Sequence, residues 1–181
     1  MAFDGPTCNK SILGPGSSAN VESPSFYVAR VRTVEDIAVV SSLFTAYTKW
    51  LDIDLSYQDF PSELANLPGK YSPPGGEMLL ARSTETNDPV GCVALRPLFP
   101  PESCEMKRLY VAPGGRGMGI GKALINEILA VAQELRYTEV KLDTLPHMEA
   151  AIRLYKQAGF APCKKYYDTP ITGTVFLSIR L

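Results

Sequence analysis

The sequence lacks any excess of positive charge. Its 18 Lys and Arg residues are offset by 19 Asp and Glu residues, which gives a formal net charge of −1 over 181 residues. Proteins whose main partner is nucleic acid or an acidic membrane surface usually carry a basic excess. The charge balance therefore argues against both classes of partner.

Long apolar runs are also missing. A membrane-spanning helix needs about 20 consecutive apolar residues, and no stretch of this chain approaches that length. A secretory signal would combine a basic start, an apolar core and a small-residue cleavage site, and the first residues do not show that pattern. We therefore predict a cytoplasmic protein with no membrane partner.

Cysteine and histidine are scarce and scattered. The four cysteines (Cys8, Cys92, Cys104 and Cys163) and the single histidine, His147, form no group with the spacing of a metal site. Cysteines in apolar, strand-like surroundings are usually buried and reduced. The sequence accordingly predicts reduced thiols and no metal.

The chain has the length of one domain with a sizeable core. Residues 1–23 are rich in Gly, Pro, Ser and Asn and show no periodicity, which is typical of a flexible leader. We predict such a leader over residues 1–23 and one folded domain over residues 24–181.

Apolar residues in this domain recur with strand spacing in some segments and helical spacing in others. Strands are predicted at residues 26–32, 77–82, 90–95, 104–111, 139–143 and 174–179, and the main helices end near residues 51, 136 and 158. The second and third strands flank a short turn and should pair antiparallel. The fourth and fifth flank a helix, so the right-handed crossover rule makes them parallel. The predicted fold class is mixed α/β, with antiparallel strands first, a central parallel pair and flanking helices.

A glycine-rich turn lies between the fourth strand and the helix that follows it. Residues 109–122 read Leu-Tyr-Val-Ala-Pro-Gly-Gly-Arg-Gly-Met-Gly-Ile-Gly-Lys. Glycine at every second position from 115 to 121 removes Cβ atoms where a ligand could approach the backbone. The helix points its unpaired N–H groups back at the turn, and Arg116 adds a fixed positive charge. This arrangement predicts a site for phosphate or pyrophosphate.

Two common nucleotide motifs do not fit this turn. A Walker A loop requires Gly, four residues and Gly-Lys-Ser/Thr, but Arg116 and Ala123 stand where the first Gly and the hydroxyl should be. The dinucleotide fingerprint Gly-x-Gly-x-x-Gly fails because its last position falls on Ile120 or Lys122. The turn is therefore neither a P-loop nor a Rossmann loop.

A third motif does fit. The sequence Arg-x-x-Gly-x-Gly occupies residues 116–121 and follows Val111-x-Pro113. A second block, Ala-Ile-Arg-Leu-Tyr-Lys-Gln-Ala-Gly-Phe, occupies residues 151–160. Together they resemble the acyl-CoA loop and the later helix of the GNAT superfamily of N-acetyltransferases. One position departs from that pattern, because Met148 stands where family members often carry Asn.

The resemblance implies a fold in which the central parallel strands splay apart and acetyl-CoA enters the gap as cosubstrate. The backbone of Leu109, Tyr110 and Val111 would bind the pantetheine arm. The pyrophosphate would lie on the loop residues Arg116, Gly117, Met118, Gly119, Ile120, Gly121 and Lys122. The acceptor would be the primary amine of a small or amino-acid-like molecule, and a homodimer is left open.

Two residues are candidates for the proton transfers that the resemblance implies. Tyr155 matches the tyrosine that protonates the departing thiol. Glu105, six residues before Val111, matches a glutamate that serves several GNAT enzymes as the base. The alternative for Glu105 is a strand ion pair with Lys107 or Arg108. His147 is a further candidate base.

The acceptor pocket is expected to be lined by the first long helix, by the irregular segment 52–76 and by the C-terminal tail. The candidate contacts are Tyr47, Asp54, Tyr57, Tyr71 and Tyr167, with Asp52 and Gln58 as further candidates from the same segment. A different class of function also stays open: a module on the same fold that binds acyl-CoA or a metabolite without turnover.

Overall fold

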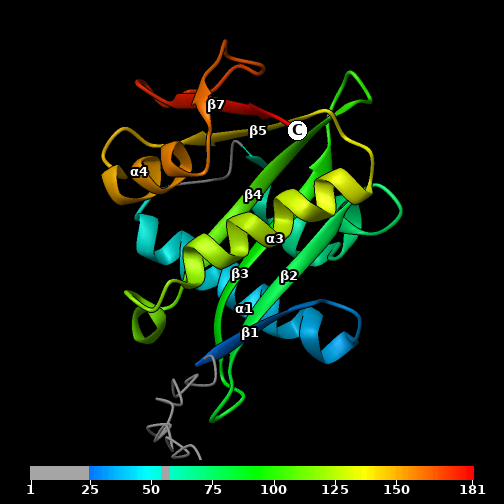
Figure 1. The fold of residues 1–181 in the computed structure, drawn as a ribbon, viewed down its shortest axis with the longest axis vertical. Coiled ribbons are helices and arrows are strands. Elements are labelled where there is room, and N and C mark those ends of the chain that lie inside the picture. The colour runs from blue at the N-terminus through cyan, green and yellow to red at the C-terminus, as the bar shows by residue number, and fades with distance from the viewer. Residues whose placement is uncertain (1–24, 54–57) are drawn as a thin grey trace, which may run out of the picture.

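The computed structural model describes residues 25–53 and 58–181. The predicted leader and two predicted acceptor contacts, Asp54 and Tyr57, lie outside this described part. Figure 1 shows a twisted sheet between helices, with α3 (Ile120–Glu134) crossing one face and α1 (Val34–Leu51) lying behind the other.

The described residues contain seven strands in one sheet. They are β1 (Phe26–Arg30), β2 (Glu77–Ser83), β3 (Pro89–Pro97), β4 (Ser103–Val111), β5 (Glu139–Thr144), β6 (Ala161–Pro162) and β7 (Val175–Arg180). Their order is β1-β2-β3-β4-β5-β7-β6. Every neighbouring pair is antiparallel except β4 with β5, which is parallel. The mixed sheet predicted from the sequence is confirmed.

The parallel pair opens part-way along its length. Strand β4 is hydrogen-bonded to β5 only where Ser103 to Glu105 face Glu139 to Lys141. Both strands then continue, β4 to Val111 and β5 to Thr144. The second half of β4 therefore presents one edge to a gap between the strands.

A bulge in β4 lies beside this gap. Lys107 pairs with Ala94 and Tyr110 pairs with Cys92, so Arg108 and Leu109 together face the single residue Val93. Arg108 has a φ of 58°, in the left-handed region. A bulge bends its strand and redirects side chains, and it breaks the alternation of β4 at Arg108.

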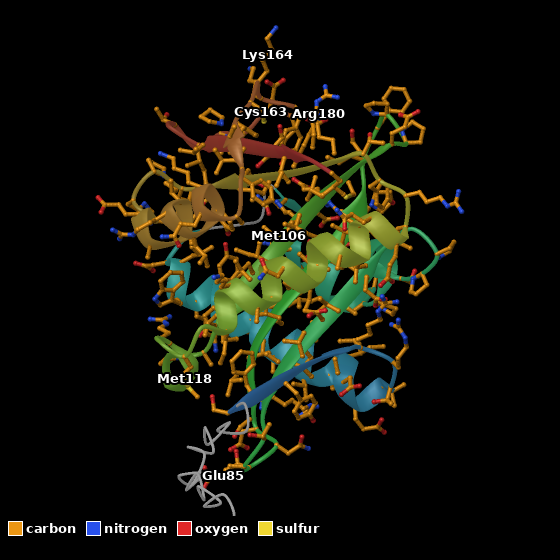
Figure 2. The ribbon with its side chains drawn as sticks, viewed as in Figure 1. Glu85, Met106, Met118, Cys163, Lys164 and Arg180 are labelled. Carbon is orange, nitrogen blue, oxygen red and sulfur yellow. The ribbon has the colours of Figure 1, made fainter. Side chains whose placement is uncertain are left out.

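The α-helices of the described residues cover the sheet and bury its two faces. Apolar side chains of α3 and α4 (Glu149–Gln157), such as Ile125 and Ile128, pack on one face. Those of α1, with Tyr71, pack on the other, and the short α2 (Phe60–Ala65) lies at its edge. Met106 lies near the middle of the molecule, whereas Met118 projects at the periphery from the loop before α3 (Figure 2).

Element boundaries follow local sequence signals where these are strong. The Oγ1 of Thr33 accepts a hydrogen bond from the backbone N–H of Asp36 at 3.1 Å, which is the N-cap that starts α1. Strand β6 was not predicted, because its two residues are ordered only by pairing with β7. The segment 52–76, which was predicted to be irregular, contains α2, which begins at Phe60.

Candidate active site

The glycine-rich turn joins the open half of β4 to the start of α3. Gly117 and Gly119 have φ values of 82° and 80°, which favour glycine because other residues are strained there. A Cβ on either residue would meet nothing within 4 Å, so both face open space. Gly119 is the N-cap of α3 and no side chain caps the helix. The first N–H groups of α3 are thus directed at a space that an anion could enter.

The other two glycines of the alternation serve packing. A Cβ at Gly115 would lie 2.8 Å from Ile120 Cδ1, and one at Gly121 would lie 3.0 Å from Leu154 Cδ2. Gly121 therefore allows α3 to approach α4 closely. Gly115 and Gly121 are thus required by packing, whereas Gly117 and Gly119 are required by their positive φ.

A cleft of ≈ 450 Å³ runs beside this turn, between the open edge of β4 and α4. We call it the loop cleft; its lining residues are Trp50, Leu109, Tyr110, Val111, Gly115, Arg116, Gly117, Gly119, Ile120, Gly121, Lys122, Met148, Ala150, Ala151, Leu154 and Tyr155. All the predicted cofactor contacts are among them except Met118, which is 42% exposed at the surface. The predicted residues therefore share one cleft.

Arg116 is held over the mouth of the loop cleft. Its Cζ lies 5.0 Å from the ring centroid of Trp50, a cation–π contact. Its Nε donates a hydrogen bond to the carbonyl oxygen of Val111 at 3.3 Å. Trp50 was not among the predicted cofactor contacts, because its position in the sequence says nothing about a turn more than sixty residues further along.

Tyr155 lies at the inner end of the loop cleft. It is 6% exposed, and its ring packs edge-on against Phe160 at 6.0 Å between centroids. Burial raises the pKa of its hydroxyl above the ordinary value, and the charges of Tyr47 and Asp143 raise it further. The phenol therefore keeps its proton at neutral pH and can act as a donor.

A second, smaller cavity of ≈ 40 Å³ adjoins the loop cleft on the α1 side of β4. Its lining is formed by Tyr47, Leu51, Gln58, Met106, Lys107, Arg108, Leu109, Asp143, Thr144, Leu145, Met148 and Tyr155. We call it the central cavity. It shares Leu109, Met148 and Tyr155 with the loop cleft. Tyr155 therefore stands where the two spaces meet.

Two ion pairs flank the central cavity. Lys107 Nζ on β4 lies 2.8 Å from Asp143 Oδ1 on β5, across the gap between the strands. Arg108 holds Glu63 on α2 with Nε and Nη2, at 2.8 and 3.0 Å.

Both acids of these pairs stay ionised at neutral pH. Burial alone would raise the pKa of Asp143, but the charge and hydrogen bond of Lys107 outweigh burial and lower it. Arg108 lowers the pKa of Glu63 against burial in the same way.

Comparison with known proteins identifies the family of this chain. Residues 40–160 match the acetyltransferase (GNAT) family. The chain belongs to the GNAT family. An uncharacterized N-acetyltransferase of Schizosaccharomyces pombe is 39% identical and covers 85% of this chain and 94% of its own length. Another uncharacterized N-acetyltransferase, from Dictyostelium discoideum, is 30% identical and covers 83% of this chain and 97% of its own length.

Solved structures show the same GNAT fold. A GNAT acetyltransferase of Staphylococcus aureus superposes with a TM-score of 0.70 at 20% identity, over 86% of this chain and 98% of its own. An acetyltransferase of Streptococcus agalactiae superposes with a TM-score of 0.71 at 19% identity, over 87% of this chain and 99% of its own. The sheet with one parallel pair is therefore the fold of the family, as the sequence motifs predicted.

Glu105, the predicted base, lies beneath the GNAT site and lines neither the loop cleft nor the central cavity. Its side chain is 0% exposed. Arg96 holds Oε2 through Nε at 2.7 Å and Nη2 at 2.6 Å, and the Tyr166 hydroxyl donates to Oε1 at 2.8 Å. Lys107 Nζ lies 3.7 Å from Oε1. Of the two predicted partners, Lys107 is within ion-pair distance and Arg108 pairs with Glu63 instead, while the main partner, Arg96, was not predicted. The base role of Glu105 stays a prediction.

Met148 occupies the position where the GNAT pattern often has Asn. It lines both the loop cleft and the central cavity, and its sulfur accepts a hydrogen bond from the Thr144 hydroxyl at 3.6 Å. His147, the preceding residue, lines a further cavity of ≈ 460 Å³, which shares Trp50 and Met148 with the loop cleft. His147 does not line the central cavity.

The predicted acceptor contacts that the structure describes fall in three places. Tyr47 lines the central cavity. Tyr71 is buried and lines a neighbouring cavity of ≈ 270 Å³, the side cavity, which shares Gln58 with the central cavity. Tyr167 helps to lower the pKa of Asp143, and the centre of its ring lies 6.0 Å from Lys107 Nζ. Tyr166, which holds Glu105, was not predicted, because its partner lies 61 residues away.

The described ranges contain no group of three or more His, Cys, Asp or Glu side chains that could hold a metal ion. Nor does any helix within them have the length and apolar character needed to cross a membrane.

Proposed function

We propose that this GNAT protein transfers an acetyl group from acetyl-CoA to the primary amine of a small acceptor in the cytoplasm. The observation that carries the proposal is the position of Tyr155, which lines both the loop cleft and the central cavity. One space suits the cosubstrate and the other suits the acceptor, and a proton donor stands between them.

The shape and polarity of the loop cleft support acetyl-CoA as the donor. The edge of β4 from Leu109 to Val111 lies beyond its pairing with β5, so an extended pantetheine arm can bind that backbone as an added strand would. The pyrophosphate would meet the N–H groups at the start of α3 together with Arg116 and Lys122.

The reaction would proceed by direct attack. The amine nitrogen bonds to the thioester carbonyl carbon, and the bond from that carbon to sulfur breaks. Tyr155 gives its proton to the departing thiolate and regains one from solvent, while the amine loses one. The products are the N-acetylated acceptor and CoA, and the enzyme needs no nucleophile of its own. Burial raises the pKa of the Cys104 thiol to about 12, which makes it a poor nucleophile.

Glu105 is the predicted base, and a pH profile tests it. If Glu105 takes the amine proton, Glu105→Gln should depress kcat/KM most at low pH, with partial rescue at high pH. If Glu105 only pairs with Arg96, the pH profile should keep its wild-type shape, while the free energy of unfolding falls by about 3 kcal/mol or more. The double variant Glu105→Gln/Arg96→Gln is the control. Compared with Glu105→Gln alone, it should recover free energy of unfolding, because Arg96 is no longer left unpaired, and it should keep the same pH profile.

Trp50 offers a direct signal of binding, because it is the only tryptophan in the chain. Its ring is 50% exposed beneath Arg116. When Arg116 turns to the pyrophosphate and the pantetheine arm covers the ring, the emission of Trp50 should shift to the blue and saturate with CoA concentration. A saturable heat of CoA binding in calorimetry with unchanged emission would contradict this assignment of the cleft.

The competing function is a GNAT module that binds acyl-CoA without turnover, which the replacement of Asn by Met148 leaves open. The two are separated by thiol release from acetyl-CoA with a panel of small amines. A transferase releases CoA in proportion to the amine, whereas a sensor binds acetyl-CoA and shows no amine-dependent release.

A further inference from the structure

Two consecutive basic residues, Lys107 and Arg108, line the same central cavity. Neighbours on a regular strand point to opposite faces of the sheet. The bulge at Arg108 breaks that alternation. Two positive side chains are thereby brought to a cavity that Asp143, the one acidic side chain in its described lining, also faces.

Both cationic side chains are buried, and each is held in place by an acidic partner. Lys107 is 7% exposed and Arg108 is 5% exposed. Asp143 holds Lys107 through one contact at 2.8 Å, and Glu63 holds Arg108 through Nε and Nη2. A lysine carries three N–H donors and an arginine five. Each side chain can therefore keep its acidic partner and donate to a ligand as well.

The charges around the cavity are balanced among the described residues. Three basic side chains (Arg96, Lys107 and Arg108) pair with three acidic ones (Glu105, Asp143 and Glu63). A simple alkylammonium would add an uncompensated positive charge next to two buried cations, which is costly. A zwitterion adds no net charge, and its negative group can meet the two cations.

The volumes fit a small charged head group. The central cavity measures ≈ 40 Å³. One water molecule needs about 10–15 Å³ of cavity volume, so the central cavity has room for a few atoms at most. The side cavity of ≈ 270 Å³ adjoins it at Gln58. A head group in the first could extend a side chain into the second.

We propose that the acceptor is an α-amino acid whose carboxylate is bound by Lys107 and Arg108, and whose amine faces Tyr155 at the junction with the loop cleft. This inference rests on the proposed function and names its substrate class. Lys107 and Arg108 are then specificity-determining residues. The product is the N-acetyl amino acid.

The test compares each of a panel of α-amino acids with its own C-terminal amide, by thiol release from acetyl-CoA at fixed pH. Amidation removes the carboxylate charge and makes the amine less basic, so the amide has the larger reactive fraction at neutral pH. We nevertheless expect kcat/KM for the best acid to exceed that for its amide by about tenfold or more, because a paired charge is lost. Equal or faster turnover of the amides would overturn the proposal.

Variants test whether Arg108 is responsible for the preference for acids over amides. The double variant Arg108→Gln/Glu63→Gln removes the cation without leaving Glu63 unpaired, and the ratio of acid to amide should fall towards one. The matched control is Arg82→Gln/Asp36→Asn, which removes another ion pair, outside all the cavities described, with its atoms 3.0 Å apart. The control should keep the wild-type ratio. A preserved ratio in the Arg108 variant, with circular dichroism showing a folded protein, would refute the role of Arg108.

Failure of this inference can be told apart from failure of the proposed function. If amides or simple amines release CoA and amino acids do not, acetyl transfer stands and the substrate class is wrong. If no acceptor releases CoA although calorimetry shows acetyl-CoA binding, the transferase proposal fails and the inference fails with it.

Discussion

Replacing Tyr155 with Phe should lower kcat by on the order of 10²-fold or more, which is the usual contribution of a general acid. The ring would still pack against Phe160 and the sheet, so the free energy of unfolding and the affinity for acetyl-CoA should change little. Steady-state kinetics and calorimetry on the same preparation measure both effects. Tyr27→Phe is the control, because Tyr27 is exposed on β1, far from the site in sequence and structure.

The leaving group provides the decisive comparison for Tyr155. A more acidic thiol departs without protonation more readily, so the loss in Tyr155→Phe should shrink on an acetyl thioester of such a thiol. An equal loss on both donors, or no loss on either, would mean that Tyr155 only shapes the cavity.

The raised pKa of Tyr155 adds a prediction about pH. A phenol whose pKa lies above the ordinary value of about 10 stays protonated up to a higher pH. Wild-type kcat should therefore show no alkaline decline from Tyr155 below about pH 10.

Replacing Gly119 with Val should raise the dissociation constant for acetyl-CoA well beyond tenfold, a cost above about 1.4 kcal/mol. Gly119 caps α3 and faces open space, so a branched side chain would stand where the pyrophosphate should approach the first N–H groups of the helix. Binding by calorimetry measures the effect directly.

Backbone strain must be separated from this steric effect, because Gly119 has a φ of 80°. Gly173 has the same φ of 80° in the loop before β7, away from the loop cleft. Gly173→Val should therefore cost comparable stability and leave acetyl-CoA affinity near the wild-type value. Unchanged affinity in a folded Gly119→Val protein would remove the pyrophosphate assignment.

The sequence by itself determined the parts of the site that are contiguous in the chain. The turn at residues 109–122 and the block at 151–160 have fixed spacing, and their conformations follow from local causes: glycine at positive φ, an uncapped helix start and a helix ended by glycine at residue 159. Short-range rules therefore predicted the anion site at the turn, whereas the role of Tyr155 was predicted from the resemblance of the two blocks to the GNAT pattern. The mixed sheet was predicted separately, from the strand and helix periodicity along residues 24–181.

The tertiary structure alone decided which charges meet. Lys107 pairs with a residue 36 positions away, and Arg108 with one 45 positions away. Glu105 meets Arg96 across the register of β3 and β4, and Tyr166 from the C-terminal loop. These partners depend on strand register, on the bulge at Arg108 and on the place where β4 and β5 separate. Such features arise from packing across the whole sheet, and no local pattern in the sequence records them.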